Sequence, residues 1–166
     1  MSAMVLIHVV ISLIAIVTGI VVMFKMLSSD RVSGLTTTFL VTTILTSATG
    51  FIIPPYITEK LLPSQAIGIL SLILLAIACY ALYSQKLSGM WRWVYVVTAL
   101  ASLYLNTFVL VIQSFLKVPA LAALAPAVPP APPSGPVFAV VQGIVLVFFV
   151  VLTIGAWRRY KPMTFA

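Results

Sequence analysis

The feature that most constrains the fold is a long apolar stretch, residues 91–119, that carries a stripe of polar side chains: WRWVYVVTALASLYLNTFVLVIQSFLKVP. It is long enough for one helix to cross a bilayer, because about 20 apolar residues span the hydrocarbon core. Ser102, Asn106 and Gln113 interrupt it and, at about 100° per residue, fall on one helix face. Since lipid offers these groups no hydrogen-bond partner, we expect this face to turn toward other helices.

The composition extends this expectation to the whole chain. Of the 166 residues, 63% are hydrophobic and 7% are charged, and the mean hydropathy is +1.25. A typical soluble domain carries about a quarter charged residues, so a soluble fold is excluded. The net charge of +7 comes from basic residues scattered at the ends of apolar stretches, which argues against nucleic-acid binding. The single cysteine, Cys79, excludes an internal disulfide and is expected to be buried and structural.

Five stretches have the length and hydrophobicity of membrane-crossing helices. The sequence therefore predicts an all-α polytopic membrane protein, a single domain built as a bundle of five transmembrane helices. We expect the first to be a retained helix and not a cleaved signal peptide, because it has no basic region before it and no A-x-A site after it. The expected spans are residues 4–27, 35–53, 64–84, 91–117 and 137–159.

The basic residues are unequally divided between the two sides of these spans. Seven lie on one side, and only Lys60 and Lys117 lie on the other. Short loops rich in Lys and Arg stay in the cytoplasm, so we expect the N-terminus outside and the C-terminus inside. The seven are Lys25, Arg31, Lys86, Arg92, Arg158, Arg159 and Lys161.

The segment between the fourth and fifth spans, residues 118–136, contains the run PPAPP. This run cannot form a helix or a sheet and favours an extended polyproline conformation. We expect a short interfacial helix at residues 120–124, followed either by an ordered strap across the mouth of the bundle or by a flexible loop.

Polar faces on several spans predict how the helices pack. In the first span, His8 and Ser12 share a narrow face with Ala15 and Gly19, so His8 is expected to point into the bundle. The second span has threonines on two opposite sides, which predicts a central helix packed on both. The polar residues that we expect to hold helices together are Thr42, Thr46, Ser102, Asn106, Gln113 and Gln142.

Asn106 lies near the middle of its span, where an amide without a partner costs several kcal/mol. We expect it to contact the threonine-rich second span or Gln142 of the fifth, in the bundle interior.

Few residues could carry chemistry. The only carboxylates, Asp30 and Glu59, are expected on opposite sides of the membrane, and an acyl-transfer triad needs an acid beside its base. No ionisable residue stands in the middle of a span, although ion-coupled transport usually requires one. A transmembrane b-type haem commonly uses two histidines, and His8 is the only one. We predict no enzyme activity, no metal site and no evident cofactor, with His8 as the one candidate ligand for haem, quinone or pigment.

The stretches FLVTTILTSATGFIIPP, LPSQAIGILSL, WRWVYVVTALASLYLN and PVFAVVQ carry a resemblance that covers most of the chain from Leu35 onward. They are similar to a family of small, uncharacterised bacterial inner-membrane proteins, mainly alphaproteobacterial. The resemblance implies the five-helix layout and no particular activity. Where such proteins have a charged or polar turn after LAP, this chain has AVPPAPPSG.

Three functions remain open from the sequence. The leading one is a non-catalytic accessory or assembly subunit of a larger inner-membrane complex, in contact with the lipid bilayer and with partner subunits or further copies of itself. The alternatives are a small oligomeric transporter or channel-like carrier of a neutral solute, and a haem-, quinone- or pigment-binding protein that uses His8.

Overall fold

The computed structural model of the protein describes residues 3–53, 63–125, 127 and 131–161, and these residues form helices joined by short connections, with no strand among them. The all-α prediction is confirmed. The elements are α1 (Ala3–Leu27), α2 (Ser33–Thr49), α3 (Pro63–Cys79), the π-helix η1 (Tyr80–Ser84), α4 (Trp91–Lys117), α5 (Pro119–Ala122) and α6 (Pro136–Arg159).

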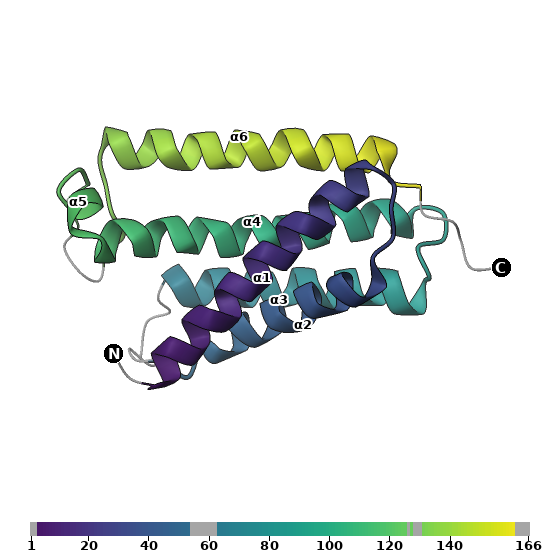
Figure 1. The fold of residues 1–166 in the computed structure, drawn as a ribbon, viewed down its shortest axis with the longest axis horizontal. Coiled ribbons are helices and arrows are strands. Elements are labelled where there is room, and N and C mark those ends of the chain that lie inside the picture. Colours follow the sequence, from purple (N-terminus) through teal and green to yellow (C-terminus); the bar gives the residue numbers. More distant parts are fainter. Residues whose placement is uncertain (1–2, 54–62, 126, 128–130, 162–166) are drawn as a thin grey trace.

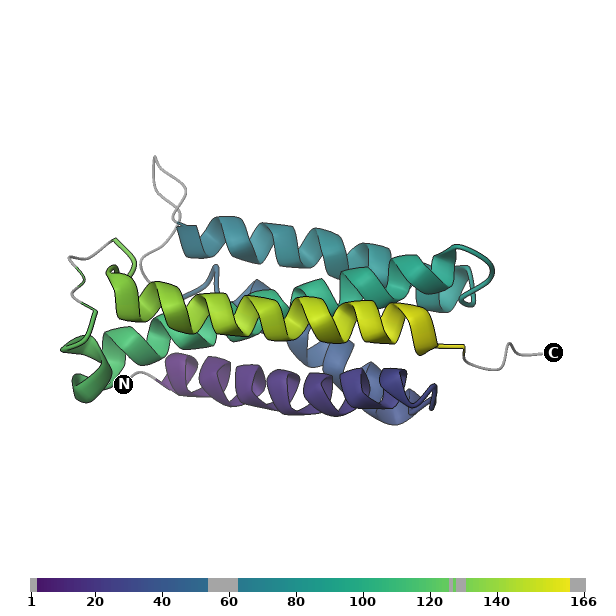
Figure 2. The same cartoon turned by 90° about the horizontal axis from the view of Figure 1, so that it is seen from above.

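Four of the described helices are long and apolar enough to cross a membrane. They are Ala3–Leu27, Pro63–Ser84, Trp91–Lys117 and Pro136–Arg159. The fifth long helix, α2, has 17 residues and is rich in threonine, and it is not among the four. It nevertheless runs along the bundle beside the other helices (Figures 1 and 2).

Most helix bounds agree with the predicted spans, but the second span is shorter than expected. The helix ends at Thr49, and Phe51 and Ile52 continue as turns through i→i−3 hydrogen bonds to Ala48 and Thr49. A helix tends to end before a proline, because the proline ring disfavours the α conformation of the preceding residue, and Pro54 follows this turn directly.

Two connections were also part of the prediction. The short helix expected at residues 120–124 exists as α5, Pro119–Ala122, with proline at its first position. Of the PPAPP run, Pro129 and Pro130 lie outside the described residues, as do Glu59 and Lys60 in the loop after α2.

Long helices that follow one another along the chain run antiparallel, so the helix ends gather at two ends of the bundle (Figure 1). We call one the basic end, where α1 and α6 finish and α4 begins, because seven basic residues lie there, from Lys25 to Lys161. The other is the Lys117 end, where α1 begins and α4 finishes. The chain connects the helices at alternate ends, which is the order that a membrane bundle requires.

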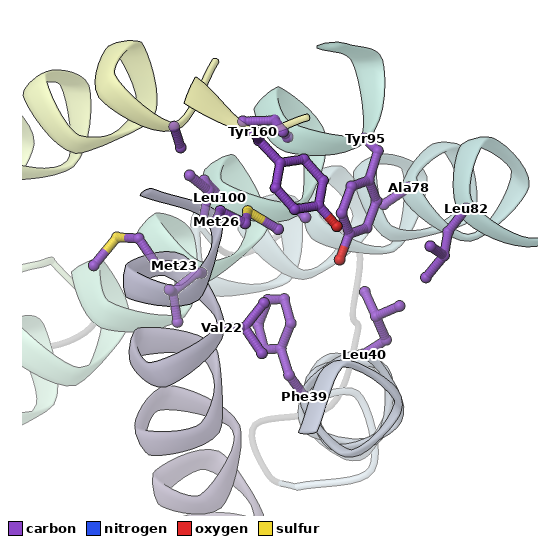
Figure 3. Packing of buried hydrophobic residues seen from close by; sticks show 14 of the residues in the cluster. Val22, Met23, Met26, Phe39, Leu40, Ala78, Leu82, Tyr95, Leu100 and Tyr160 are labelled. Atoms are coloured by element: carbon purple, nitrogen blue, oxygen red, sulfur yellow. The ribbon is translucent and has the colours of Figure 1, made fainter. Parts of the chain in front are cut away.

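The apolar core fills the half of the bundle near the basic end (Figure 3). Tyr95 of α4 is 1% exposed, and its ring centroid lies 6.2 Å from that of Tyr160, which follows α6. Leu40 from α2 and Met26 from α1 complete the layer, each 1% exposed. Aromatic side chains bury a large area each and methionine side chains fill irregular gaps, so this half of the molecule is closely packed.

The centre of the bundle depends on Gly19. A Cβ atom added there would lie 2.5 Å from Leu103 Cδ1 of α4 and 2.8 Å from the Phe39 ring of α2. Only a glycine permits three helices to approach so closely, as small residues do at helix crossings in lipid. From this crossing α1 runs obliquely and diverges from α4 toward its own N-terminus (Figure 1).

The two faces predicted for α2 are not equivalent. Thr36, Phe39 and Thr43 are buried, whereas Thr38 is exposed and Thr42 bonds its own helix at the Thr38 carbonyl over 2.7 Å. The prediction of a central helix packed on both sides therefore holds in part: Thr49 bonds His8 of α1 and Ser47 bonds Ser71 of α3, whereas Thr38 is exposed. A threonine that satisfies its hydroxyl on its own backbone is tolerated on an outer face and does not require a neighbour.

The Gly19 contact predicts a pair of contrasting substitutions. Gly19→Ala should destabilise the protein by about 1–3 kcal/mol, because the added methyl group overpacks the crossing of α1, α2 and α4. Gly143→Ala, in α6, should cause no loss, since no atom lies within 4 Å of its Cβ position. Thermal unfolding of the two variants in the same detergent measures the difference, and equal melting temperatures would contradict the packing role of Gly19.

Candidate functional site

A cavity of about 630 Å³ lies between α1, α2, α3 and α4 in the half of the bundle near the Lys117 end. α1 lines it from Val5 to Ile16 and α4 from Leu105 to Lys117, so the cavity occupies the space where these two helices diverge from their contact at Gly19. Asn106 stands 11 residues before Lys117, so the cavity reaches roughly 16 Å along α4, at 1.5 Å per residue. Small-molecule sites typically have volumes of roughly 300–1,000 Å³.

The wall is mainly apolar, with a minority of polar side chains from each of the four helices. Val9, Leu13, Ile67, Leu105 and Val109 supply much of the apolar surface. No acidic residue of the described chain lines it. The polar lining residues are His8, Ser12, Thr46, Ser47, Ser64, Gln65, Ser71, Asn106, Gln113, Ser114 and Lys117.

His8 is held at the wall by a hydrogen bond between its Nδ1 and Thr49 Oγ1, 2.8 Å apart. Thr49 also donates to the Leu45 carbonyl oxygen over 2.7 Å, which uses its one hydroxyl hydrogen. Thr49 Oγ1 must therefore accept from Nδ1–H of His8. In the neutral imidazole this leaves Nε2 with a lone pair that can accept a hydrogen bond. The prediction that His8 faces protein is confirmed.

Three serine hydroxyls of the wall donate hydrogen bonds within the protein. Ser12 donates to the His8 carbonyl oxygen over 2.7 Å, and Ser114 donates to the Leu110 carbonyl over 2.8 Å. Ser47 of α2 donates to Ser71 of α3 over 3.2 Å and joins the two helices. These groups make the wall polar at low cost, because each hydroxyl has a partner without the help of lipid or water.

Two polar atoms of other wall residues differ from these serine hydroxyls, because they make no hydrogen bond within the described chain. Asn106 Nδ2 and Thr46 Oγ1 are both buried and have no hydrogen-bond partner among the described residues. A buried donor without an acceptor costs roughly 1–3 kcal/mol, so such groups are uncommon and call for an explanation. Both belong to residues that line the cavity. The two atoms are themselves buried, so they lie behind the surface that the cavity presents.

The six predicted packing residues divide into three groups. Asn106, Gln113 and Thr46 line the cavity, so the interior location expected for Asn106 is confirmed, beside α2. The side-chain amide of Asn106 was expected to contact α2 or Gln142, but its Nδ2 has no hydrogen-bond partner in the described chain.

Gln142, which was expected as one possible partner of Asn106, donates its Nε2 to the Phe108 carbonyl oxygen over 3.1 Å instead. It thereby ties α6 to α4, as a packing residue does. Ser102 is fully buried and bonds the Thr98 carbonyl of its own helix, so it fills the α4 interface without bridging it. Thr42 stays on the outer side of α2 and takes no part in the cavity.

Several polar cavity residues were not identified as site residues from the sequence, among them Gln65 and Lys117. Gln65 and Lys117 line the wall near the helix ends, and Gln65 is 4% exposed. The signal for Gln65 was its spacing of three and six residues before Gly68 and Ser71, which places all three on one face of α3. Lys117 was assigned only a topological role.

The chain matches no protein-family model, no curated protein sequence and no solved structure. The described residues contain no group of three or more His, Cys, Asp or Glu side chains that could hold a metal ion. The geometry of the cavity is therefore the basis for a functional proposal.

The cavity predicts a pattern of thiol reactivity. In a Cys79→Ala background, Ser12→Cys and Gln113→Cys should react with a small water-soluble thiol reagent, because both positions line the cavity. Ser102→Cys should react far more slowly, since Ser102 is 0% exposed within α4. Labelling rates followed by mass spectrometry provide the measurement, and equal rates at Ser12 and Ser102 would contradict the cavity.

Proposed function

We propose that this protein is a non-catalytic membrane protein that binds a small neutral ligand in the cavity between α1, α2, α3 and α4. The observation that supports this most directly is the cavity itself, which is mainly apolar, of ligand size, and has polar side chains such as His8 and Ser12 on its wall. Small-molecule sites are typically apolar cavities of this size in which a few polar groups orient the ligand.

The charge of the wall supports a neutral ligand. No carboxylate among the described residues lines it, and its one fixed charge, Lys117, lies at the end of α4. Asp30 is at the basic end and pairs with Lys25 at 3.1 Å. A cation would have no counter-charge in the cavity, and a charged group in a mainly apolar wall is costly without one.

The proposal includes the finer topology: five membrane-crossing helices in a bacterial inner membrane, with the Lys117 end outside. In support, α2 has the same course as its neighbours, and all of the described basic residues except Lys117 lie at the basic end. The bacterial location rests on the family resemblance. The cavity would then face the outer half of the membrane.

The cavity favours ligand binding over the accessory-subunit prediction. The apolar side chains exposed on α1 and α6, such as Val17 at 61% and Ile144 at 64%, suit lipid and a partner subunit equally. They do not distinguish a subunit of a complex from a protein that acts alone, whereas the cavity is a specific feature that packing between subunits does not require.

Carriage of a neutral solute is the second candidate, because a cavity that reaches one end of a bundle is what a carrier presents in one of its states. The core at the basic end would have to open for passage. Flux of solute into proteoliposomes separates a carrier from a binding protein.

Ligand binding is tested by photo-crosslinking with a diazirine-bearing dodecanol, with the labelled residues found by peptide mass spectrometry. Cavity residues such as Leu13 and Val109 should be labelled saturably, and excess dodecanol should compete. Ser12→Phe should abolish this labelling by filling the cavity, whereas Val17→Phe, on the lipid-facing side of the same helix, should preserve it. Labelling of the wall that never saturates, or that survives Ser12→Phe, would overturn the proposal.

The topology is tested with alkaline phosphatase fusions, which are active only outside. Fusions after Glu59 and Lys117 should be active, and fusions after Arg31, Lys86 and Arg159 should be inactive. Equal activity after Arg31 and Glu59 would show that α2 does not cross, and activity after Arg159 would reverse the orientation.

A further inference from the structure

We infer that the cavity opens sideways, through a gap between α1 and α4, to the lipid of the outer half of the membrane, and that its ligand is a neutral lipophilic molecule that enters from the bilayer. This assignment rests on the proposed function, since it assumes that the cavity holds a ligand and that the Lys117 end lies outside. A rim of exposed leucines, the closed neighbouring sides and the mainly apolar wall support it.

The rim of the gap consists of two leucines that stand within their helices and not at the helix ends. Leu13 of α1 and Leu110 of α4 both line the cavity, and they are 44% and 36% exposed. At about 100° per residue, Leu13 stands between Ile16, a cavity residue that is 6% exposed, and Val17, which is 61% exposed and outside the wall. Leu13 therefore marks the line where the cavity wall becomes the outer surface of α1.

The other exposed residues of the wall lie at or next to helix ends. The cavity therefore opens in two directions, at the Lys117 end and sideways at Leu13 and Leu110. The exposed wall residues near the helix ends are Gly50, Ser64, Lys117 and Val118.

The gap follows from the oblique course of α1. At Gly19 the two helices touch, since a Cβ atom there would lie 2.5 Å from Leu103 Cδ1 of α4. From this contact α1 diverges from α4 toward its own N-terminus (Figure 1). α6 packs against α4, but none of its described residues lines the cavity, so α6 does not fill the space between α1 and α4.

Hydrogen bonds between helices close the neighbouring sides of the cavity. Between α1 and α2, His8 Nδ1 and Thr49 Oγ1 are hydrogen-bonded at 2.8 Å. Between α2 and α3, the Ser47 and Ser71 hydroxyls are hydrogen-bonded at 3.2 Å. A ligand that entered between either pair of helices would have to break one of these bonds, whereas the rim between α1 and α4 is formed by an apolar side chain on each side.

The gap lies at a depth where lipid and not water faces it. Leu110 precedes Lys117 by seven residues, or roughly 10 Å along α4 at 1.5 Å per residue. Leu13 follows Ala3 by ten residues, or roughly 15 Å along α1. Since the hydrocarbon core is about 30 Å thick, the rim stands in its outer half. A molecule dissolved among the lipid chains therefore reaches the cavity without crossing the aqueous phase.

The composition of the wall favours such a molecule over a water-soluble one. Val9, Ile67 and Val109 are among the apolar side chains that line it. Side chains around an empty cavity lack dispersion contacts on their inner side, and a hydrocarbon group supplies these contacts. A sugar or another neutral polyol would place hydroxyl groups against these side chains and would lose hydrogen bonds to water without replacement.

A probe that stays in the bilayer tests the gap: a phosphatidylcholine with a diazirine near the end of one acyl chain, with the protein in phosphatidylcholine vesicles. Its chain reaches the wall only from the side, because the lipid as a whole does not dissolve in water. Val109 should be labelled, and excess dodecanol should suppress this labelling. Ile14 and Leu116, which are exposed but not part of the wall, should be labelled with and without dodecanol.

Two double variants connect this labelling to the rim. Leu13→Trp with Leu110→Trp should narrow the gap, and labelling of Val109 by the lipid probe should be lost. Ile14→Trp with Leu116→Trp, at positions that are 42% and 38% exposed outside the wall, should retain it.

A thiol reaction shows that the tryptophans narrow the gap without filling the cavity. In a Cys79→Ala background, Gln113→Cys should react with a small water-soluble reagent at the same rate in both double variants, because this reagent enters at the Lys117 end.

The outcomes separate the side opening from the proposed function. If the free diazirine dodecanol labels Val109 saturably but the lipid probe does not, the side opening is overturned and the proposed function stands. Lipid labelling that survives the pair Leu13→Trp and Leu110→Trp would overturn the location of the gap. Displacement of the dodecanol probe by glycerol would overturn the lipophilic ligand. Labelling by the dodecanol probe that never saturates would overturn the proposed function itself.

Discussion

The contact of α1 with α2 and α4 at Gly19 determines which half of the bundle is closely packed and which half contains the cavity. Two straight helices that cross at an angle separate on both sides of the crossing. On the side of the basic end, the same face of α1 carries Met23 and Met26, whose long side chains fill the widening gap and are 0% and 1% exposed. On the other side it carries Ala15, Ser12 and His8, which are too short or too polar to fill it. The cavity is the result of this gradient of side-chain size along one helix face.

The polar residues of the cavity show how a membrane bundle can contain hydrogen-bonding groups without being destabilised by them. The hydroxyl of Ser12 bonds its own helix, and that of Ser47 bonds Ser71 of the next helix. Each therefore has a partner before any ligand arrives, as membrane interiors require. Asn106 Nδ2 and Thr46 Oγ1 have no partner among the described residues. Gln142 is satisfied at one end of its amide: Nε2 donates to the Phe108 carbonyl on α4, whereas the buried Oε1 has no partner among the described residues.

Much of the fold could be predicted because membrane helices are limited by length and hydrophobicity. The bounds of α4 agree with the predicted span at both ends, and those of α1, α6 and the combined α3 and η1 agree within one residue. Periodicity likewise placed His8 on the inner face of α1 and Asn106 on that of α4. For the threonines of α2 periodicity was a weaker guide, because a hydroxyl bonded to its own backbone is tolerated on an outer position such as Thr38 as well as on an inner one such as Thr43.

The cavity could not be predicted, because it depends on the angle at which α1 crosses its neighbours and not on any local pattern. The sequence contained its parts separately: a glycine at position 19, small residues before it, and an isolated amide at Asn106. Only the crossing brings residues 8, 46 and 106 to one space. For the same reason the hydrogen bond between His8 and Thr49, which joins residues 41 positions apart, had no signature in either segment.

The position of the cavity relative to the core constrains how a ligand can enter and leave. The wall reaches Lys117 and Ser64 at the ends of their helices, whereas the opposite half is filled by Tyr95, Phe39 and Met26. Opening that half would expose large aromatic and methionine side chains and would break the three-helix contact at Gly19. Exchange through the Lys117 end requires neither.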